Sequence, residues 1–185
     1  MSHTHTRANI FWCDSLESTN SELKSRRGEL ENLSIIAARE QTGGRGQGDH
    51  KWCSEPGMNL TFSVLMKFRG GQLRARDEQI INTVLTPVMV DFLASQGVEA
   101  WVKAPNDIWV NDKKIAGILI ENILSGPYVI DCIAGIGFNL NQTSWPEDLP
   151  NPVSLMQLTG RKYSPEDVLE TLSSMLADKF EEVFG

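Results

Sequence analysis

The sequence lacks any apolar run of about 18 residues, the length that a membrane-spanning helix needs. It is also poor in positive charge: 17 Lys and Arg stand against 24 Asp and Glu, and the net charge of −7 argues against a general nucleic-acid binder. The segment Met1–Asn9 has no apolar core of a secretory signal, and we expect His3 and His5 in it to be solvated rather than bound to metal. A protein that binds neither membrane nor nucleic acid is therefore favoured.

Cysteine is scarce as well. Cys13, Cys53 and Cys132 are far apart and odd in number, and they have neither disulfide-framework nor zinc spacing. A reducing cytoplasm fits this pattern best. The length of 185 residues, with 41% hydrophobic residues, is enough for one domain with a sizeable core.

Glycine is concentrated in one stretch, QTGGRGQGDHKW at residues 41–52. Its four glycines permit backbone angles and close approaches that a side chain would forbid, and the embedded Arg45 can fork onto an anion. The stretch has no Walker pattern and no G-x-G-x-x-G that opens a helix. Taken alone, it suits an anion-binding loop and, equally well, a solvated hairpin.

Hydrophobic periodicity predicts the regular elements. Strands are predicted over 10–13, 34–39, 59–67 and 98–102, followed by an antiparallel meander over 107–141. Helical spacing predicts a helix over 80–93, which Pro87 should kink or weaken, and a closing helix over 168–183. Ser18 or Thr19 is expected to cap a further helix.

Five polar or glycine-punctuated clusters lie along these elements. Singly, each has a plain structural explanation: a helix cap, a turn, a solvated lysine, or a glycine that relieves crowding. In order they read E-S-T-N (17–20), Q-T-G-G-R-G-Q…W (41–52), K-x-P-N-D-I (103–108), K-I-A-G-I-L-I-E (114–121) and G-I-G-x-N-x-N (135–141). This ordered combination, from about residue 10 to residue 160, resembles the biotin protein ligases.

The resemblance implies a fold and an activity. The fold is α+β, a mixed and largely antiparallel sheet flanked by helices, similar to class II aminoacyl-tRNA synthetases. The activity is formation of biotinyl-5′-adenylate from biotin and ATP with Mg²⁺, then transfer of biotin to a lysine of a biotin carboxyl carrier protein. We expect one catalytic domain over residues 1–185, without an N-terminal DNA-binding domain and with the C-terminal β-domain of many members absent or truncated. A homodimer is also compatible with the family.

Functional residues carry over where this sequence matches the family's motifs. The biotin-binding positions are Ser18, Thr19, Gln41, Gly44, Arg45, Trp52, Lys114, Gly117 and Leu119. The ATP-binding positions are Arg45, Gly46, Gln47, Trp52, Asn106, Lys114 and Asn139. The catalytic positions are Arg45, Asp107 and Lys114, and no metal ligand is assigned.

These roles agree with elementary chemistry. Hydroxyl and amide groups suit the ureido ring of biotin, which both donates and accepts hydrogen bonds. Arg45 and Lys114, with Mg²⁺, would offset the repulsion between a carboxylate and a polyphosphate. Asp107 could orient or deprotonate the acceptor lysine, while Trp52 could stack on the ligand or simply anchor the core. The glycine-rich loop is expected to act as a lid that excludes water.

Two departures from the family pattern affect the prediction. Where many members have G-R-G-R-R-G-R, Gln47, Gly48 and His50 replace arginines and Asp49 replaces a glycine, so we expect weaker retention of the adenylate. Ala104 replaces the usual aromatic residue of K-W-P-N-D. Two alternatives stay open: a lipoate or octanoate transferase of the same fold, and a non-catalytic module that binds biotin or its adenylate.

Overall fold

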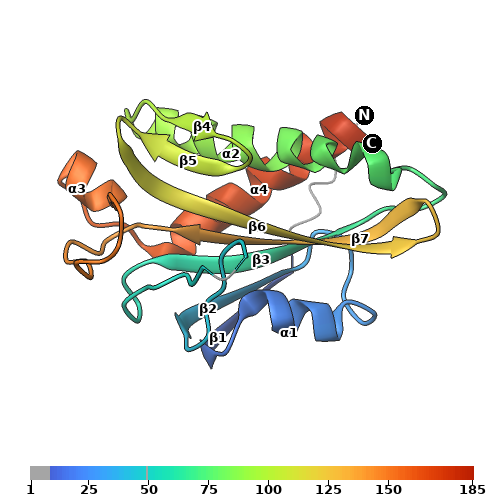
Figure 1. Ribbon diagram of the computed structural model, residues 1–185, viewed down its shortest axis with the longest axis horizontal. Helices are drawn as coiled ribbons and strands as arrows, with labels where there is room; N and C mark the ends of the chain where they lie inside the picture. The colour runs from blue at the N-terminus through green and yellow to red at the C-terminus, as the bar shows by residue number, and fades with distance from the viewer. Residues whose placement is uncertain (1–8, 49) are drawn as a thin grey trace.

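A seven-stranded sheet is the centre of the computed structural model, which describes residues 9–48 and 50–185 (Figure 1). The predictions made for His3, His5 and Asp49 lie outside the described residues. The strands are β1 (Ile10–Leu16), β2 (Ile35–Gln41), β3 (Leu60–Lys67), β4 (Trp101–Lys103), β5 (Asp107–Val110), β6 (Lys113–Ser125) and β7 (Tyr128–Phe138). The helices are α1 (Thr19–Arg26), a 3₁₀ segment η1 (Ala75–Ile81), α2 (Asn82–Ser95), α3 (Leu155–Thr159) and α4 (Pro165–Phe184).

The strand order across the sheet is β1-β2-β3-β7-β6-β5-β4. β1 pairs with β2 in parallel, and the other neighbouring strands pair antiparallel. The predicted meander is confirmed, with Asn111 at φ 53° in the β5–β6 turn and Gly126 at φ 57° in the β6–β7 turn. The α+β prediction of a mixed, largely antiparallel sheet is therefore confirmed.

The two faces of the sheet are covered unequally (Figure 1). The long helices α2 and α4 pack on one face, where alternate β3 residues such as Val64 and Met66 join the main core. The short helix α1 packs on the other face, over Leu65 and Ile133. Because α1 has only eight residues, it covers only part of that face. The rest of the face is available for a cavity.

Capping explains how the helices begin, including one that periodicity did not predict. The side chain of Ser18 caps α1, as predicted. α3 was missed because it is only five residues long, although Ser154 and Gln157 form a capping box at its start. α2 contains Pro87 and continues to Ser95, and the predicted kink or loss of stability at Pro87 stays a prediction. No helix in the described part of the chain is long and apolar enough to cross a membrane.

Candidate active site

A cavity of about 410 Å³ opens on the face of the sheet that α1 leaves uncovered. Its floor includes Gly117 on β6 and the pair Gly135 and Gly137 on β7. A Cβ atom on Gly137 would lie 2.2 Å from Cε2 of Trp52, and one on Gly135 would lie 2.2 Å from Oδ1 of Asn20. Both distances are far too short, so the cavity and its walls depend on side chains being absent at these glycines.

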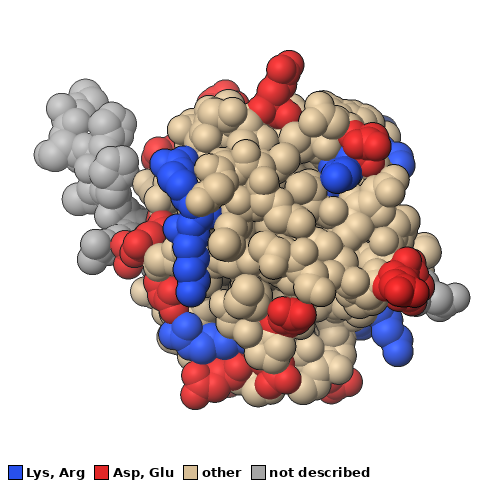
Figure 2. Space-filling model, turned by 90° about the vertical axis from the view of Figure 1, so that its left-hand side faces the viewer, with Lys and Arg blue, Asp and Glu red and all other residues tan. Residues whose placement is uncertain are grey.

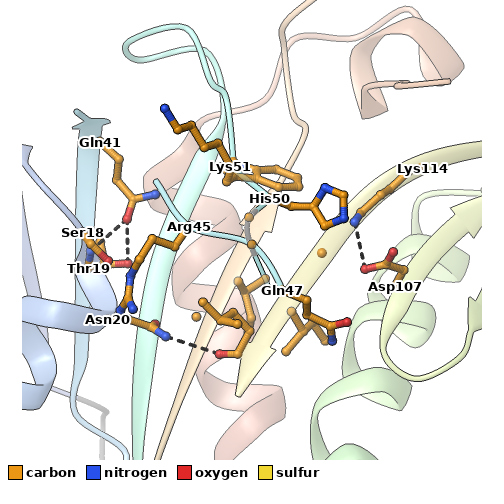
Figure 3. Close-up of a pocket in the computed structure, with 18 of the residues that line it drawn as sticks. Ser18, Thr19, Asn20, Gln41, Arg45, Gln47, His50, Lys51, Asp107 and Lys114 are labelled. Atoms are coloured by element: carbon orange, nitrogen blue, oxygen red, sulfur yellow. Dashed lines mark hydrogen bonds and ion pairs between the residues drawn. The ribbon is translucent and has the colours of Figure 1, made fainter. Parts of the chain in front are cut away.

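The α1 side of the cavity is polar and internally hydrogen-bonded. Hydroxyl and amide groups lie close together here because α1 begins directly after β1, whose last residue, Leu16, pairs with Gln41 at the end of β2. The backbone N–H of Thr19 donates to Oε1 of Gln41 at 2.8 Å, and its hydroxyl lies 3.1 Å from the same atom (Figure 3). This orientation uses the carbonyl oxygen of Gln41 and leaves its Nε2 amide group as a hydrogen-bond donor.

Lys114 and Asp107 lie across the cavity from these groups (Figure 3). Nζ of Lys114 is 2.9 Å from Oδ1 of Asp107, and each side chain is 31% exposed. The Lys114 backbone is fixed on both sides: its N–H donates to Asn151 and its carbonyl accepts from Val153. The ammonium group therefore starts from a rigid strand and is still accessible from the cavity.

The glycine-rich loop forms a small hairpin over the cavity. The N–H of Gly46 donates to the carbonyl of His50 at 2.7 Å, and the N–H of Trp52 donates to the carbonyl of Gly44 at 3.0 Å. Nε2 of Gln47 donates to Oδ1 of Asn106 at 2.9 Å. The residue that replaces a family arginine thus connects the loop to the turn between β4 and β5.

Arg45 lies on the α1 side of the cavity, across from Lys114 (Figure 3). Its Nη2 atom is 3.0 Å from Oε2 of Glu121 and 3.4 Å from the hydroxyl of Ser21. The two cations expected to offset the repulsion between a carboxylate and a polyphosphate therefore lie on opposite walls of the cavity. In this geometry each cation can contact a different part of an extended ligand.

Most of the site residues expected from sequence line this one cavity: Ser18, Thr19, Gln41, Arg45, Gly46, Gln47, Trp52, Asp107, Lys114, Gly117 and Leu119. Three others do not. A Cβ on Gly44 would lie 2.4 Å from the Trp52 carbonyl oxygen, so Gly44 permits the hairpin. Asn106 faces a neighbouring hollow and accepts the Gln47 hydrogen bond.

Asn139 is the third residue outside the cavity lining. It is only 3% exposed, and its Nδ2 donates to the carbonyls of Val153 at 3.1 Å and Lys114 at 3.4 Å. The structure thus gives Asn139 a supporting contact to the backbone of Lys114. Its predicted contact with adenine stays untested.

Several cavity residues were given no role from the sequence: Asn20, Lys103, Trp109, Gly135, Ile136 and Gly137. For the glycines a signal existed, because glycine inside a strand often allows close approach. The sequence also carried a signal for Glu121, which contacts the cavity-lining Arg45. Gly117, Leu119 and Glu121 alternate along β6, so they share a face of the sheet.

Surface charge, cysteine reactivity and metal-binding groups determine which other kinds of site a protein can carry. On the face seen in Figure 2, a narrow column of Lys and Arg side chains runs down the left-hand side beside Asp and Glu side chains, and other charged side chains of both signs lie toward the right-hand edge. Burial raises the pKa of the Cys132 thiol, with Glu78 and Asp131 adding to the effect, so this cysteine is a poor nucleophile. Among the described residues, no three His, Cys, Asp or Glu side chains are grouped as metal ligands.

Similarity to known proteins agrees with this geometry. Residues 12–139 match the biotin/lipoate A/B protein ligase family. The chain is 30% identical over 165 residues to the biotin–[acetyl-CoA-carboxylase] ligase of Paracoccus denitrificans, covering 87% of this chain and 68% of that one. It is 33% identical to the bifunctional ligase/repressor BirA of Salmonella typhimurium over 137 residues, which are 74% of this chain and 42% of BirA.

Solved structures show the same similarity. The biotin protein ligase from Aquifex aeolicus in complex with biotin and ATP superimposes with a TM-score of 0.78 at 26% identity, over 95% of this chain and 72% of that one. The chain belongs to the biotin/lipoate A/B protein ligase family.

Proposed function

We propose that the chain is an ATP-dependent biotin–protein ligase. It would activate biotin as biotinyl-5′-AMP and then transfer the biotinyl group to a lysine of a biotin carboxyl carrier protein. The observation that carries the proposal is the cavity itself, which has a hydrogen-bonding end at Thr19 and Gln41 and an ammonium group at Lys114 on the opposite wall. Its volume of about 410 Å³ suits a small ligand.

The polar end supports biotin over a fatty acyl group. Nε2 of Gln41 can donate to the ureido carbonyl, and the hydroxyls of Ser18 and Thr19 can accept from the ureido N–H groups. An octanoyl or lipoyl chain has no such groups, so it would displace water from Nε2 of Gln41 without replacing the hydrogen bond, whereas the hydroxyls of Ser18 and Thr19 keep their protein partners. Leaving one polar group unsatisfied under a ligand costs about 1–3 kcal/mol, which favours a ligand that accepts from Gln41.

The end of the cavity at Lys114, where the carboxylate of biotin would lie, supports adenylation. A carboxylate oxygen of biotin would attack the α-phosphorus of ATP, and the bond from that phosphorus to pyrophosphate would break. Lys114 can stabilise the negative charge on both reactants, and Trp52 and the loop above it can exclude water from the mixed anhydride. Mg²⁺ would neutralise part of the polyphosphate charge, and with no grouped protein ligands among the described residues it would bind mainly phosphate oxygens and water.

The transfer step needs a base or an orienting group for the acceptor lysine. The Asp107 carboxylate lies at the cavity and is 31% exposed, so an incoming ammonium group can reach it. The carrier domain of a biotin-dependent carboxylase is the partner we propose, in a reducing cytoplasm that suits the free cysteines Cys13, Cys53 and Cys132. A homodimer stays a prediction that sedimentation equilibrium can test.

Pyrophosphate release tests this proposal. The protein is mixed with ATP and Mg²⁺ and, in separate reactions, with biotin, octanoate or lipoate. We expect release with biotin, and biotinylation of an added carrier domain at a single lysine. Release with octanoate or lipoate alone would move the chain to the acyltransferase alternative, and biotin binding without release would identify a non-catalytic module.

A further inference from the structure

The guanidinium of Arg45 has a specific protein partner, the carboxylate of Glu121. Nη2 of Arg45 lies 3.0 Å from Oε2 of Glu121, and the Glu121 side chain is only 22% exposed. Arg45 belongs to the glycine-rich hairpin, whereas Glu121 belongs to the long strand β6. The pair therefore connects a loop that carries a cavity-lining cation to a rigid part of the sheet.

Glu121 is also held by a buried side chain of α1. Nδ2 of Asn20 donates to the same Oε2 atom at 2.7 Å. Asn20 is 3% exposed, and its Oδ1 accepts from the hydroxyl of Ser63 at 2.6 Å. The hydroxyl of Ser63 is also 2.8 Å from that of Thr19, so the polar end of the cavity belongs to the same network. Glu121 is thus the anchored member of the pair.

Arg45 still has N–H donors available for a ligand while Glu121 and Ser21 bind its Nη2. Among the described residues, its side-chain hydrogen bonds involve Nη2 alone, to Glu121 and Ser21. Since guanidinium has five N–H donors, Nε and Nη1 stay available, and Arg45 lines the cavity. Glu121 is not among the cavity-lining residues, and the cavity-lining Arg45 lies against its carboxylate.

We propose that Glu121 is a positioning residue that orients Arg45 toward the anionic part of the ligand during adenylate formation. This inference rests on the proposed ligase function. Glu121 and Ser21 both accept from Nη2, which restricts where the guanidinium can lie, and a donor held in place stabilises developing charge without reorganisation. Without Glu121, the side chain of Arg45 would keep only the 3.4 Å contact with Ser21 and would have to be ordered by the ligand in each turnover.

A double-mutant cycle tests the inference, using single-turnover pyrophosphate release with biotin and ATP. Glu121→Gln keeps an oxygen that can accept from Asn20 but removes the charge that holds Arg45. We expect it to slow adenylate formation about tenfold, less than the roughly 10²–10³-fold cost of losing a stabilising donor outright. In an Arg45→Ala background, Glu121→Gln should have no further effect. Lys24→Met is the matched control, because Lys24 also pairs with Glu121, at 3.8 Å, but does not line the cavity.

Each outcome is decisive. The positioning role is supported if Glu121→Gln slows adenylate formation in the parent background but not in the Arg45→Ala background, and if Lys24→Met reacts at the parent rate. An equal loss in both backgrounds would show that Glu121 acts through the fold, and a faster Glu121→Gln enzyme would show that it competes with the ligand for Arg45; either result overturns the inference. Adenylate formation by the parent protein tests the ligase function separately, so failure of one proposal is distinguishable from failure of the other.

Discussion

The indole ring of Trp52 lies directly over Gly137, where any side chain would overlap it. A Cβ atom at residue 137 would be 2.2 Å from Cε2 and 2.6 Å from Cδ2 and Cζ2 of the ring. The ring also approaches Gly117, whose Cβ would lie 3.2 Å from Cζ3. Two strand glycines therefore determine where the tryptophan of the loop can lie, and with it the shape of the cavity.

Gly137→Ala should consequently displace the indole into the cavity. We expect the free energy of unfolding to fall by about 1–3 kcal/mol, as for other overpacked sites, and the Kd for biotin to rise at least about tenfold. Calorimetric titration with biotin and urea unfolding measure the two effects. Gly28→Ala is the control, because a Cβ there meets nothing within 4 Å. Parent-like biotin affinity in Gly137→Ala would show that the ring does not shape the binding site.

Gln47 gives a test of adenylate retention. It lines the cavity where many family members have arginine, and here it donates to Asn106. Gln47→Arg adds a cation beside the phosphates, so we expect biotinyl-AMP to escape about tenfold more slowly, equivalent to about 1.4 kcal/mol. Labelling of lysines on an added bystander protein reports the escape. Arginine at Gly48 is a poorer choice, because φ there is +60° and a side chain would be strained.

The control for that experiment adds a charge elsewhere. Thr171→Arg changes net charge by the same amount on the exposed surface of α4. It should leave bystander labelling unchanged. If labelling by the Gln47→Arg protein matches that of the parent, the arginine-poor loop does not control retention.

The pair of Arg39 and Glu166 predicts a pH dependence of stability. A hydrogen bond from its own backbone N–H and a 2.6 Å contact with Arg39 lower the pKa of the Glu166 carboxyl. A lowered folded-state pKa stabilises the protein above the unfolded value near about 4.3, and this stabilisation is lost as pH falls through the folded pKa. We expect Glu166→Gln to cost about 0.2–1 kcal/mol at pH 7, because the pair is exposed.

Urea unfolding at a series of pH values measures this difference. The gap between parent and Glu166→Gln should close as the parent carboxyl becomes protonated. Glu170→Gln, one turn along α4 on an exposed position, should show no such gap at neutral pH. A constant gap down to the lowest pH would rule out the carboxylate charge as its source.

The sequence predicted those elements whose pattern is local. β3, β6 and β7 have long apolar or alternating runs, and the β6–β7 turn at Gly126 has a strong turn composition. The parallel pairing of β1 with β2 was not predicted, although strands separated by a helix commonly pair in parallel. η1 and α3 are too short for helical periodicity to reveal.

The cavity residues were predictable largely because their motifs resemble a family, and their partners were not. Nothing in the spacing of residues 45 and 121 indicates that Arg45 meets Glu121, because that contact depends on how the hairpin folds back over β6. The same holds for Gln47 and Asn106, which are brought together only in the tertiary structure. Side-chain networks of this kind follow from packing rather than from local sequence.

Single-turnover pyrophosphate release measures whether this cavity joins biotin to AMP with the help of Lys114. The parent protein and the Lys113→Ala control should release pyrophosphate only when biotin and ATP are both present. Lys114→Ala should be slower by about 10²–10³-fold with an unchanged melting curve, and Lys114→Arg should recover part of the rate. A folded Lys114→Ala protein that forms the adenylate at the parent rate would contradict the account.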